Sequence, residues 1–191
     1  MKTPTLETER LILRPISLED APGFQKYLYD WEIVKYVSGS ITPPYPDNGA
    51  EEYIKNTVLP DLEKGEAFGW AIVPKSGEDK GTAIGNIYYR LKKQLPDNDR
   101  GFWLARKYHG QGLMTEAISK TQDFMFFEYG WKSFRVKNAI GNHASRRVKE
   151  KCGAVLIGEE DKPSAHMPGP TQIWEVTREN WLKLRKKTLT K

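Results

Sequence analysis

The clearest chemical signal in the sequence is a pair of glycines, Gly110 and Gly112, in a short polar turn. The turn follows the apolar run 102–105, which predicts a β-strand, and precedes a stretch with helical spacing that starts at Leu113. The first N–H groups of a helix have no partner within the helix and carry the positive end of its dipole. Because glycine has no side chain, a phosphate can approach such a turn closely. The pattern therefore predicts a site for a phosphorylated cofactor.

Other interpretations of these glycines are open at this point. The phosphate loop of nucleoside triphosphatases needs Gly-x-x-x-x-Gly-Lys-Ser/Thr, and no such run occurs in the chain. The dinucleotide fingerprint Gly-x-Gly-x-x-Gly has its third glycine where this chain has Thr115, and it lies early in a strand–helix–strand unit. The two glycines could also form only a tight turn.

Four segments in order resemble the GNAT acetyltransferases, and within them the ribosomal-protein N-acetyltransferase (RimJ/RimL-like) branch. The stretch KYHGQG at 107–112 is similar to the pyrophosphate loop of the family, Gln/Arg-x-x-Gly-x-Gly/Ala. TERLILRP at 8–15 resembles the opening strand of the branch, and GFWL at 101–104, with TEA at 115–117, resembles its Gly-Tyr-Trp-Leu strand and following helix. NHAS at 142–145 and KCG at 151–153 resemble its Asn-x-x-Ser … Lys-x-Gly-Phe segment. Two positions depart from the pattern: Lys107 replaces Gln or Arg, and Ala154 replaces the aromatic residue.

The resemblance implies that acetyl-CoA is the cofactor. Backbone N–H groups from about Tyr108 to Leu113 would bind the pyrophosphate, and the open edge of the strand near Leu104 would pair with the pantetheine arm. His109 would shape the loop or contact phosphate. The cofactor-binding residues predicted in this way are Trp103, Leu104, Ala105, Lys107, Tyr108, His109, Gly110, Gln111, Gly112, Leu113, Met114, Thr115, Asn142 and Ser145.

Acyl transfer to an amine also needs groups that act on the reacting atoms. A free backbone N–H near Leu104 would donate to the carbonyl oxygen as its charge grows. Many members of the wider family use a tyrosine seven residues after the asparagine to stabilise the leaving thiolate, but that position holds Lys149 here. The resemblance implies that Ser145 replaces it, although on local grounds Ser145 could serve only its own helix terminus.

The candidate for the general base is Asp99. The branch often has a glutamate two positions before the glycine of its Gly-Tyr-Trp-Leu strand, and strand alternation puts Asp99 on the same face as Gly101 and Trp103. A solvated carboxylate at the start of a strand is the alternative. For the acceptor cleft we predict three aromatic residues of the same meander: Trp70, Tyr88 and Trp103.

Histidine and cysteine suggest no further chemistry. His143 and His166 have no partners at metal-ligand spacing, so no metal is expected. The single cysteine, Cys152, lacks a His and Asp arrangement and is expected to be buried. It cannot form an internal disulfide, which favours a reducing cytoplasm.

The composition fits one folded domain over residues 1–191: 38% of the residues are hydrophobic and 12% are aromatic. The apolar runs are far shorter than the ~20 residues that cross a membrane. The net charge of +5 lies partly in a basic tail, 181–191, which we expect to be solvated. Another part lies at 146–151, which could approach the cofactor phosphates or form an exposed face. No basic stripe interleaved with aromatics indicates nucleic-acid binding.

Periodicity predicts the elements that position these residues. Helices are expected over 17–28, 31–37, 49–64 (interrupted near Pro60), 113–129 and 142–151, and strands over 10–16, 68–73, 83–91, 99–105, 134–140, 154–158 and 173–177. The order after residue 99 requires some parallel pairing. The fold class is thus α/β of the α+β type. The resemblance implies the GNAT fold: a central mixed, mostly antiparallel sheet of six to seven strands flanked by helices, in which splayed parallel strands hold the cofactor.

The function expected from these observations is acetyl-CoA-dependent acetylation of a primary amine by direct attack in a ternary complex. The leading acceptor is the N-terminal amine of a protein, as in the RimJ/RimL-like branch. The alternatives are a small amine, such as a polyamine or an aminoglycoside-like compound, and a non-catalytic acyl-CoA sensor. A monomer and a homodimer are both compatible with the sequence.

Overall fold

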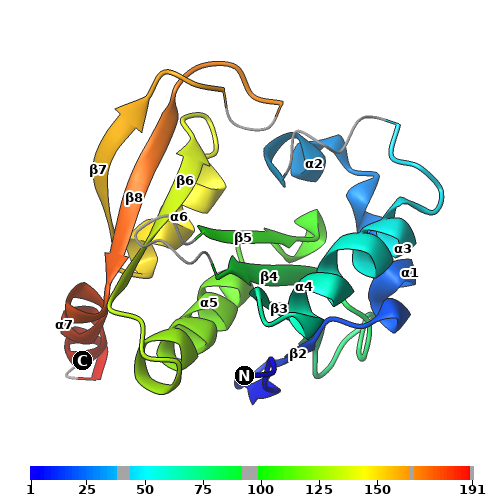
Figure 1. Ribbon diagram of the computed structural model, residues 1–191, viewed down its shortest axis with the longest axis horizontal. Coiled ribbons are helices and arrows are strands. Elements are labelled where there is room, and N and C mark those ends of the chain that lie inside the picture. Colours follow the sequence, from blue (N-terminus) through cyan, green and yellow to red (C-terminus); the bar gives the residue numbers. More distant parts are fainter. Residues whose placement is uncertain (38–43, 92–98, 164–165, 190–191) are drawn as a thin grey trace.

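The structure, a computed structural model, describes residues 1–37, 44–91, 99–163 and 166–189, and two antiparallel sheets organise them (Figure 1). The larger sheet has the order β1-β2-β3-β4-β5 and the smaller one β6-β8-β7. The strands are β1 (Leu6–Glu7), β2 (Leu11–Pro15), β3 (Ala67–Pro74), β4 (Gly85–Arg90), β5 (Asp99–Leu104), β6 (Ser133–Ala139), β7 (Ala154–Glu160) and β8 (Thr171–Thr177).

The strands β3, β4 and β5 form the antiparallel meander that their short connections predict. Trp70 pairs with Ile87, Gly69 pairs with Tyr88, and Tyr88 pairs in turn with Gly101. Because side chains alternate across a strand, this register separates Trp70 from Tyr88, which lie on opposite faces of the sheet.

Each face of the five-stranded sheet has its own hydrophobic core. Trp70, Tyr89 and Phe124 belong to the core under α5 (Leu113–Asp123), which continues into the π-helical turn Phe124–Glu128. The other core, which contains Phe24 and Trp103, is covered by α1 (Ala21–Leu28), α2 (Trp31–Val37), α3 (Gly49–Tyr53) and α4 (Leu59–Glu63). The remaining helices are α6 (His143–Lys151) and α7 (Arg178–Leu189).

The helical stretch 49–64 is not interrupted at Pro60. A π-helical turn, Ile54–Val58, joins α3 to α4, and Pro60 lies within the first two residues of α4. Proline has no N–H to donate, and the wide turn before it, in which Leu59 N–H donates to Ile54 C=O, takes up the local distortion of the helix. The sequence pattern therefore placed the helix correctly, and the irregular turn lies next to Pro60, near the predicted interruption.

The sheet arrangement differs in one respect from a single mixed sheet. Every strand pairing among the described residues is antiparallel, and β6 pairs with β8 and not with β5. β8 lies between β7 and β6, so one edge of β6 is fully paired and the other faces β5 across a gap. The neighbouring strands that were expected to splay apart are β5 and β6, and they belong to two separate sheets.

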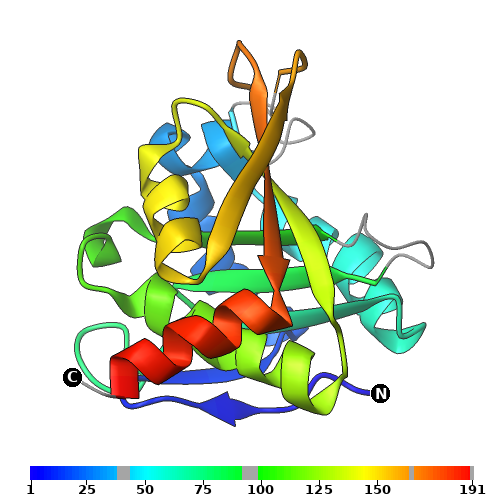
Figure 2. The ribbon, with the colours of Figure 1, turned by 90° about the vertical axis from the view of Figure 1, so that its left-hand side faces the viewer.

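The segment 181–191, expected to be a solvated tail, belongs to α7 as far as Leu189. Trp181 is buried, and its indole N–H donates to Asp123 Oδ1 at 2.8 Å, which docks α7 against the end of α5 (Figure 2). Leu184 packs against the same core, and Arg185 pairs with Asp123 Oδ2 at 3.2 Å, so apolar and charged side chains together anchor α7. None of the helices in the ranges given above has the length and apolar character that crossing a membrane requires.

Candidate active site

A long cleft of about 1430 Å³ runs between the two sheets. The starts of α5 and α6 line one part of it, and α2, α3 and the neighbouring part of β4 line another. Tyr36 of α2 donates to the Gly141 carbonyl, next to the start of α6, at 3.3 Å. The β5 edge, the loop before α5, β6 and the rest of α6 complete the lining. The cleft thus brings together segments that are far apart in the sequence.

The start of α5 presents backbone N–H groups to this cleft. Gly110 and Gly112 have positive φ angles of 77° and 79°, which favour glycine, and both line the cleft. The first helical hydrogen bond runs from Glu116 N–H to Gly112 C=O. The N–H groups of residues 113–115, which also line the cleft, therefore have no acceptor within the helix. This is the arrangement that binds phosphate.

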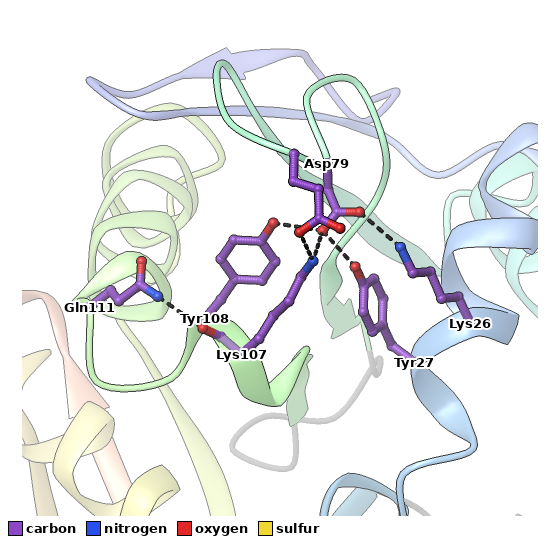
Figure 3. A network of polar contacts seen from close by, with 7 residues as sticks. Lys26, Tyr27, Asp79, Lys107, Tyr108 and Gln111 are labelled. Carbon is purple, nitrogen blue, oxygen red and sulfur yellow. Dashed lines mark hydrogen bonds and ion pairs between the residues drawn. The ribbon is translucent and has the colours of Figure 1, made fainter.

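The outer side of the same loop is tied to a buried carboxylate, Asp79, in the turn between β3 and β4 (Figure 3). The oxygens of Asp79 accept from Lys26 Nζ at 3.0 Å, Tyr27 Oη at 2.6 Å, Tyr108 Oη at 2.7 Å and Lys107 Nζ at 2.5 Å. Two of these donors belong to α1 and two to the loop, so one carboxylate joins three segments.

The hydrogen bonds of this cluster shift the titration of its members. Burial by itself would raise the pKa of Asp79, but its hydrogen bonds, led by that of Lys107, outweigh burial and hold the pKa well below its usual range. The pKa of Lys107 is raised because its ammonium donates to Asp79 and Glu78. Burial, with the hydrogen bond to Asp79, raises the pKa of Tyr108 to about 12. The cluster is therefore charged and fully bonded at neutral pH.

A second clamp holds the helix start from the N-terminal side. The Arg10 backbone N–H donates to Glu116 Oε1 at 3.0 Å, and the Arg10 guanidinium donates to Glu116 Oε2 at 2.7 Å and to the Gln111 carbonyl at 2.9 Å. The Gln111 side chain donates to the Lys107 carbonyl at 2.9 Å. These contacts keep the loop shape while its inner N–H groups remain directed at the cleft.

The edge of β5 that faces away from β4 presents the backbone of Leu104. Ala105 N–H donates to Ile84 C=O on the β4 side at 2.8 Å, and strand alternation turns Leu104 the other way. The Leu104 carbonyl lies 2.8 Å from His109 Nε2, which donates in the tautomer that this contact requires. The Leu104 N–H shares that side of the strand and faces the cleft.

Helix α6 contributes a chain of polar contacts to the opposite wall. Asn142 caps the helix, and its Oδ1 accepts from Ser145 N–H at 3.0 Å. Ser145 Oγ accepts from Lys149 Nζ at 2.6 Å, and the same ammonium donates to Asn138 Oδ1 at 3.0 Å. Lys149 is only 3% exposed, and its Nζ lies 5.4 Å from the ring centre of Phe102. A buried cation therefore sits between α6, β6 and β5.

Arg100 adds a second buried cation to the wall. It is 4% exposed, and its Nη1 donates to Gln122 Oε1 at 2.6 Å. Its Nε and Nη2 have no hydrogen-bond partner in the described part of the chain. The guanidinium lies over the rings of Phe134 and Phe102, at 5.3 Å and 5.8 Å. The inner wall of the cleft is thus positively charged.

The segments that form this cleft lie within a domain of a known family. Residues 10–155 match the model of the acetyltransferase (GNAT) domain, a stretch that contains the glycine loop, the β5 edge and α6. The chain belongs to the GNAT family.

Relatives of this GNAT chain occur in bacteria and fungi. It is 34% identical over 126 residues to the uncharacterized N-acetyltransferase p20 of Bacillus licheniformis, a match that covers 64% of the chain and 66% of that protein, just under two thirds. It is 26% identical over 206 residues to an FsC-acetyl coenzyme A-N(2)-transacetylase of Aspergillus fumigatus, a match that covers 98% of the chain and 82% of that protein.

Solved GNAT structures share the fold. The ribosomal-protein-S5-alanine acetyltransferase of Vibrio fischeri superimposes with a TM-score of 0.76 at 19% identity, over 93% of this chain and 98% of that one. RimJ of Mycobacterium smegmatis, in complex with CoA-disulfide, superimposes with a TM-score of 0.74 at 15% identity, over 93% and 89% of the two chains. The GNAT fold that the motifs imply is confirmed.

Most of the predicted site residues of this GNAT chain line one cleft. They are Tyr88, Trp103, Leu104, Tyr108, His109, Gly110, Gly112, Leu113, Met114, Thr115, Asn142 and Ser145. Ala105, Lys107 and Gln111 are not among the lining residues. The Lys107 ammonium is turned to the outside of the loop, where it pairs with Asp79 and Glu78. The Asp99 side chain lies outside the described residues, although its backbone pairs with Arg90 in the GNAT sheet.

Trp70 is a core residue and not part of the acceptor cleft. It is fully buried, stacks on Phe68 at 5.8 Å between ring centres and donates from its indole N–H to the Pro4 carbonyl at 2.7 Å. The strand register explains the difference, because Trp70 and Tyr88 occupy opposite faces. Tyr88 and Trp103 do line the cleft of this GNAT domain. Burial, with the hydrogen bond to Asp61 at 2.8 Å, raises the pKa of Tyr88 and keeps its hydroxyl protonated.

The sequence pattern did not indicate that Arg100 and Lys149 of this GNAT cleft are buried cations. Arg147, Lys149 and Lys151 line the cleft, whereas Arg146 is turned away and pairs with Glu150 at 2.9 Å. The basic segment is therefore divided between the cleft and the outside. A signal for Lys149 was present: it stands four residues after Ser145, one helical turn, at the position of the family tyrosine. No cluster of metal-ligating side chains occurs within the described ranges.

Proposed function

We propose that this protein is an acetyl-CoA-dependent N-acetyltransferase of the RimJ/RimL-like branch that acetylates the N-terminal amine of a protein. One observation supports the proposal most: the glycine loop and the first turn of α5 direct unpaired N–H groups into the same cleft as the Leu104 N–H. A phosphate-binding helix start and a donor for an acyl oxygen are the two parts that acyl transfer from coenzyme A needs.

Different residues of the cleft carry out different parts of the proposed reaction. The N–H groups from Gly110 to Thr115 bind the diphosphate, and Arg147 and Lys151, exposed at the same end, add positive charge. The Leu104 N–H stabilises the negative charge that grows on the carbonyl oxygen during attack. Ser145 hydrogen-bonds the sulfur as it leaves. The thioester itself supplies an activated acyl group, so no covalent enzyme intermediate is needed.

The acceptor end of the cleft supports a peptide substrate. The whole cleft exceeds the 300–1,000 Å³ typical of pockets for a single small molecule, which leaves room for an extended chain end beside the acyl donor. Its charged lining at that end is mixed, with Glu32 and Glu52 beside Arg90 and Arg106. A terminal α-amine titrates near 8, so a fraction is neutral at physiological pH without strong basic help. Asp99 is the residue that we propose as base or amine anchor.

The test combines binding with product identification. Calorimetry with coenzyme A should show binding, and incubation of acetyl-CoA with a panel of peptides and small amines should release thiol only with an accepted amine. Mass spectrometry should then locate the new acetyl group on a peptide α-amine. Binding without thiol release across the whole panel would favour an acyl-CoA sensor, and the absence of binding would overturn the proposal.

A small amine is the second candidate acceptor. It is favoured by the relative that matches 98% of this chain, which is named as an acetyl-CoA-N(2)-transacetylase and not as a protein-modifying enzyme. Preferential acetylation of small amines over peptides in the same panel would support this candidate against the first.

A further inference from the structure

The most unusual group in the cleft is the buried ammonium of Lys149. It is 3% exposed and lies where α6 approaches both sheets. Its Nζ donates to Ser145 Oγ at 2.6 Å on its own helix and to Asn138 Oδ1 at 3.0 Å on β6. It also lies 5.4 Å from the ring of Phe102 on β5, two residues before Leu104. A lysine is seldom so deeply buried unless its charge has a specific use or partner.

The contact with Ser145 determines what that charge can do. An ammonium donates but cannot accept, so the Ser145 oxygen must be the acceptor in this bond and its own hydrogen is directed elsewhere. A hydroxyl that accepts from a cation becomes a stronger donor, because the positive charge polarises the O–H bond. Ser145 lines the cleft, where this stronger donor can face a substrate atom.

We propose that Lys149 is a positioning residue that turns Ser145 into a charge-assisted proton donor for the sulfur that leaves during acyl transfer. The inference rests on the proposed function, since it concerns the leaving group of that reaction. Lys149 thereby supplies, through Ser145, the proton that a phenol supplies at the same helix position in many members of the family.

The proton transfers in this step balance. The acceptor nitrogen forms the new C–N bond, the C–S bond breaks, and sulfur takes the hydroxyl proton of Ser145. Ser145 Oγ takes a proton from Lys149 Nζ. The proton lost by the attacking amine goes to solvent, and solvent returns a proton to Lys149. No oxidant, reductant or metal is required.

Other charged or titratable groups near Lys149 are few within the described residues. Arg100 on β5 shares the Phe102 ring, at 5.8 Å, and Cys152 at the end of α6 is a buried thiol whose pKa is raised by burial. From β6, Lys137 is exposed and paired with Glu160 at 2.5 Å. From α5, Gln122 is uncharged. Arginine side chains keep their charge throughout the accessible pH range, so a change in the thiol pKa caused by substitution at position 149 or 145 reports on Lys149 and Ser145. Arg147 and Lys151, the other cations of α6 that line the cleft, are unchanged in these variants.

Coenzyme A alone provides a readout that needs no acceptor and no turnover. The ultraviolet absorbance of the thiolate gives the pKa of the bound thiol, after subtraction of the signal of the unliganded protein, which removes Cys152. In the wild type we expect this pKa to lie below the value that the same titration gives for coenzyme A free in solution. Lys149→Met should raise the pKa of the bound thiol by about one unit, which is a tenfold decrease in its acid dissociation constant. Lys149→Arg should keep most of the depression, because it retains the charge.

Matched variants separate this role from a structural one. Ser145→Ala should raise the thiol pKa by a similar amount, and the double variant with Lys149→Met should show no further change, since the two residues act as one unit. Lys120→Met, which makes the same change at an exposed position on α5, should leave the pKa unaltered. With an accepted amine, Lys149→Met should lower kcat at least tenfold with little change in KM for acetyl-CoA.

Two results would overturn the inference, and they differ. If Lys149→Met binds coenzyme A with an unchanged thiol pKa, Lys149 has no role toward the sulfur although the proposed function stands. If the wild type fails to bind coenzyme A, the proposed function fails together with the inference. If Lys149→Met does not fold, Ser145→Ala provides the same test, because an unchanged thiol pKa in that variant would also overturn the inference.

Discussion

Two lysines near the cleft have different roles because their ammonium groups have different partners. Lys107 lies in the glycine loop, but its ammonium is bound outside the cleft by Asp79 and Glu78. Lys149 lies in a helix that is rich in basic residues, but its ammonium is buried against Ser145. The same residue type therefore stabilises a loop in one case and faces the site in the other. Sequence alone grouped Lys107 with the cofactor-binding loop and Lys149 with a basic segment, and only the geometry shows which ammonium lies in the cleft.

A substitution of Ser145 tests its chemical role at this scale. Ser145→Ala should lower kcat by about 10- to 100-fold, at the lower end of the 10²–10⁴-fold typical for a positioned proton donor. The dissociation constant of coenzyme A should change by less than about threefold, because the backbone N–H groups of the loop remain intact. Steady-state kinetics and calorimetry on the same preparation measure the two quantities. Equal losses in both would assign the hydroxyl to binding or to folding.

At the scale of elements, the glycine loop and α5 act as a unit held from outside. Arg10 clamps Glu116 and the Gln111 carbonyl, Asp79 holds Lys107 and Tyr108, and the inner backbone is left for a ligand. The strong helix prediction from Leu113 was correct because its apolar spacing is local information. The clamps were not predictable, since Arg10 and Asp79 are distant from the loop in sequence.

Two glycines, one just before α5 and one just after the helical stretch that continues it, permit a matched test of the glycine loop. Gly112 precedes the helix with φ 79° and Gly130 follows it with φ 91°, so alanine at either position should cost about 1–2 kcal/mol of stability. Only Gly112→Ala should also weaken coenzyme A binding, by about tenfold, because it displaces N–H groups at the cleft. Denaturant unfolding and calorimetry of the two variants provide the comparison. Equal affinities would show that the loop does not hold the ligand.

At the scale of the whole molecule, the cleft exists because the two sheets do not join. β8 pairs with both β6 and β7, which leaves β5 and β6 as facing edges with space between them. Asp79 then fixes α1, the β3–β4 turn and the glycine loop to one another on the side away from the small sheet. The stability of the larger half should therefore depend on this carboxylate.

Acid should remove the contribution that the Asp79 carboxylate makes to stability. The pKa of Asp79 is depressed in the folded state, so the stability it provides is present above the unfolded value of about 3.9 and is lost as pH falls towards the folded value. Asp79→Asn should cost about 1–3 kcal/mol of unfolding free energy at pH 7, since several donors lose a charged acceptor. The difference from the wild type should shrink below about pH 4, as urea titrations at both pH values would show.

A control for this measurement is Glu179→Gln, which removes an exposed helix carboxylate paired with Lys183. That pair should contribute little to stability at either pH, because solvent screens it. A difference for Asp79→Asn that stays constant down to acid pH would contradict the role given to the charge of Asp79.

The sequence by itself determined the family, the order of most strands and helices, the glycine loop and the Asn142–Ser145 cap, because each of these depends on residues close together in the chain. Only the tertiary structure decided that Trp70 is core, that Lys107 is turned outward, that 181–189 is a docked helix and that Lys149 is buried beside Ser145. These outcomes depend on which face of a strand or helix meets another element. That choice is made by contacts between distant segments, which no local pattern of residue types contains.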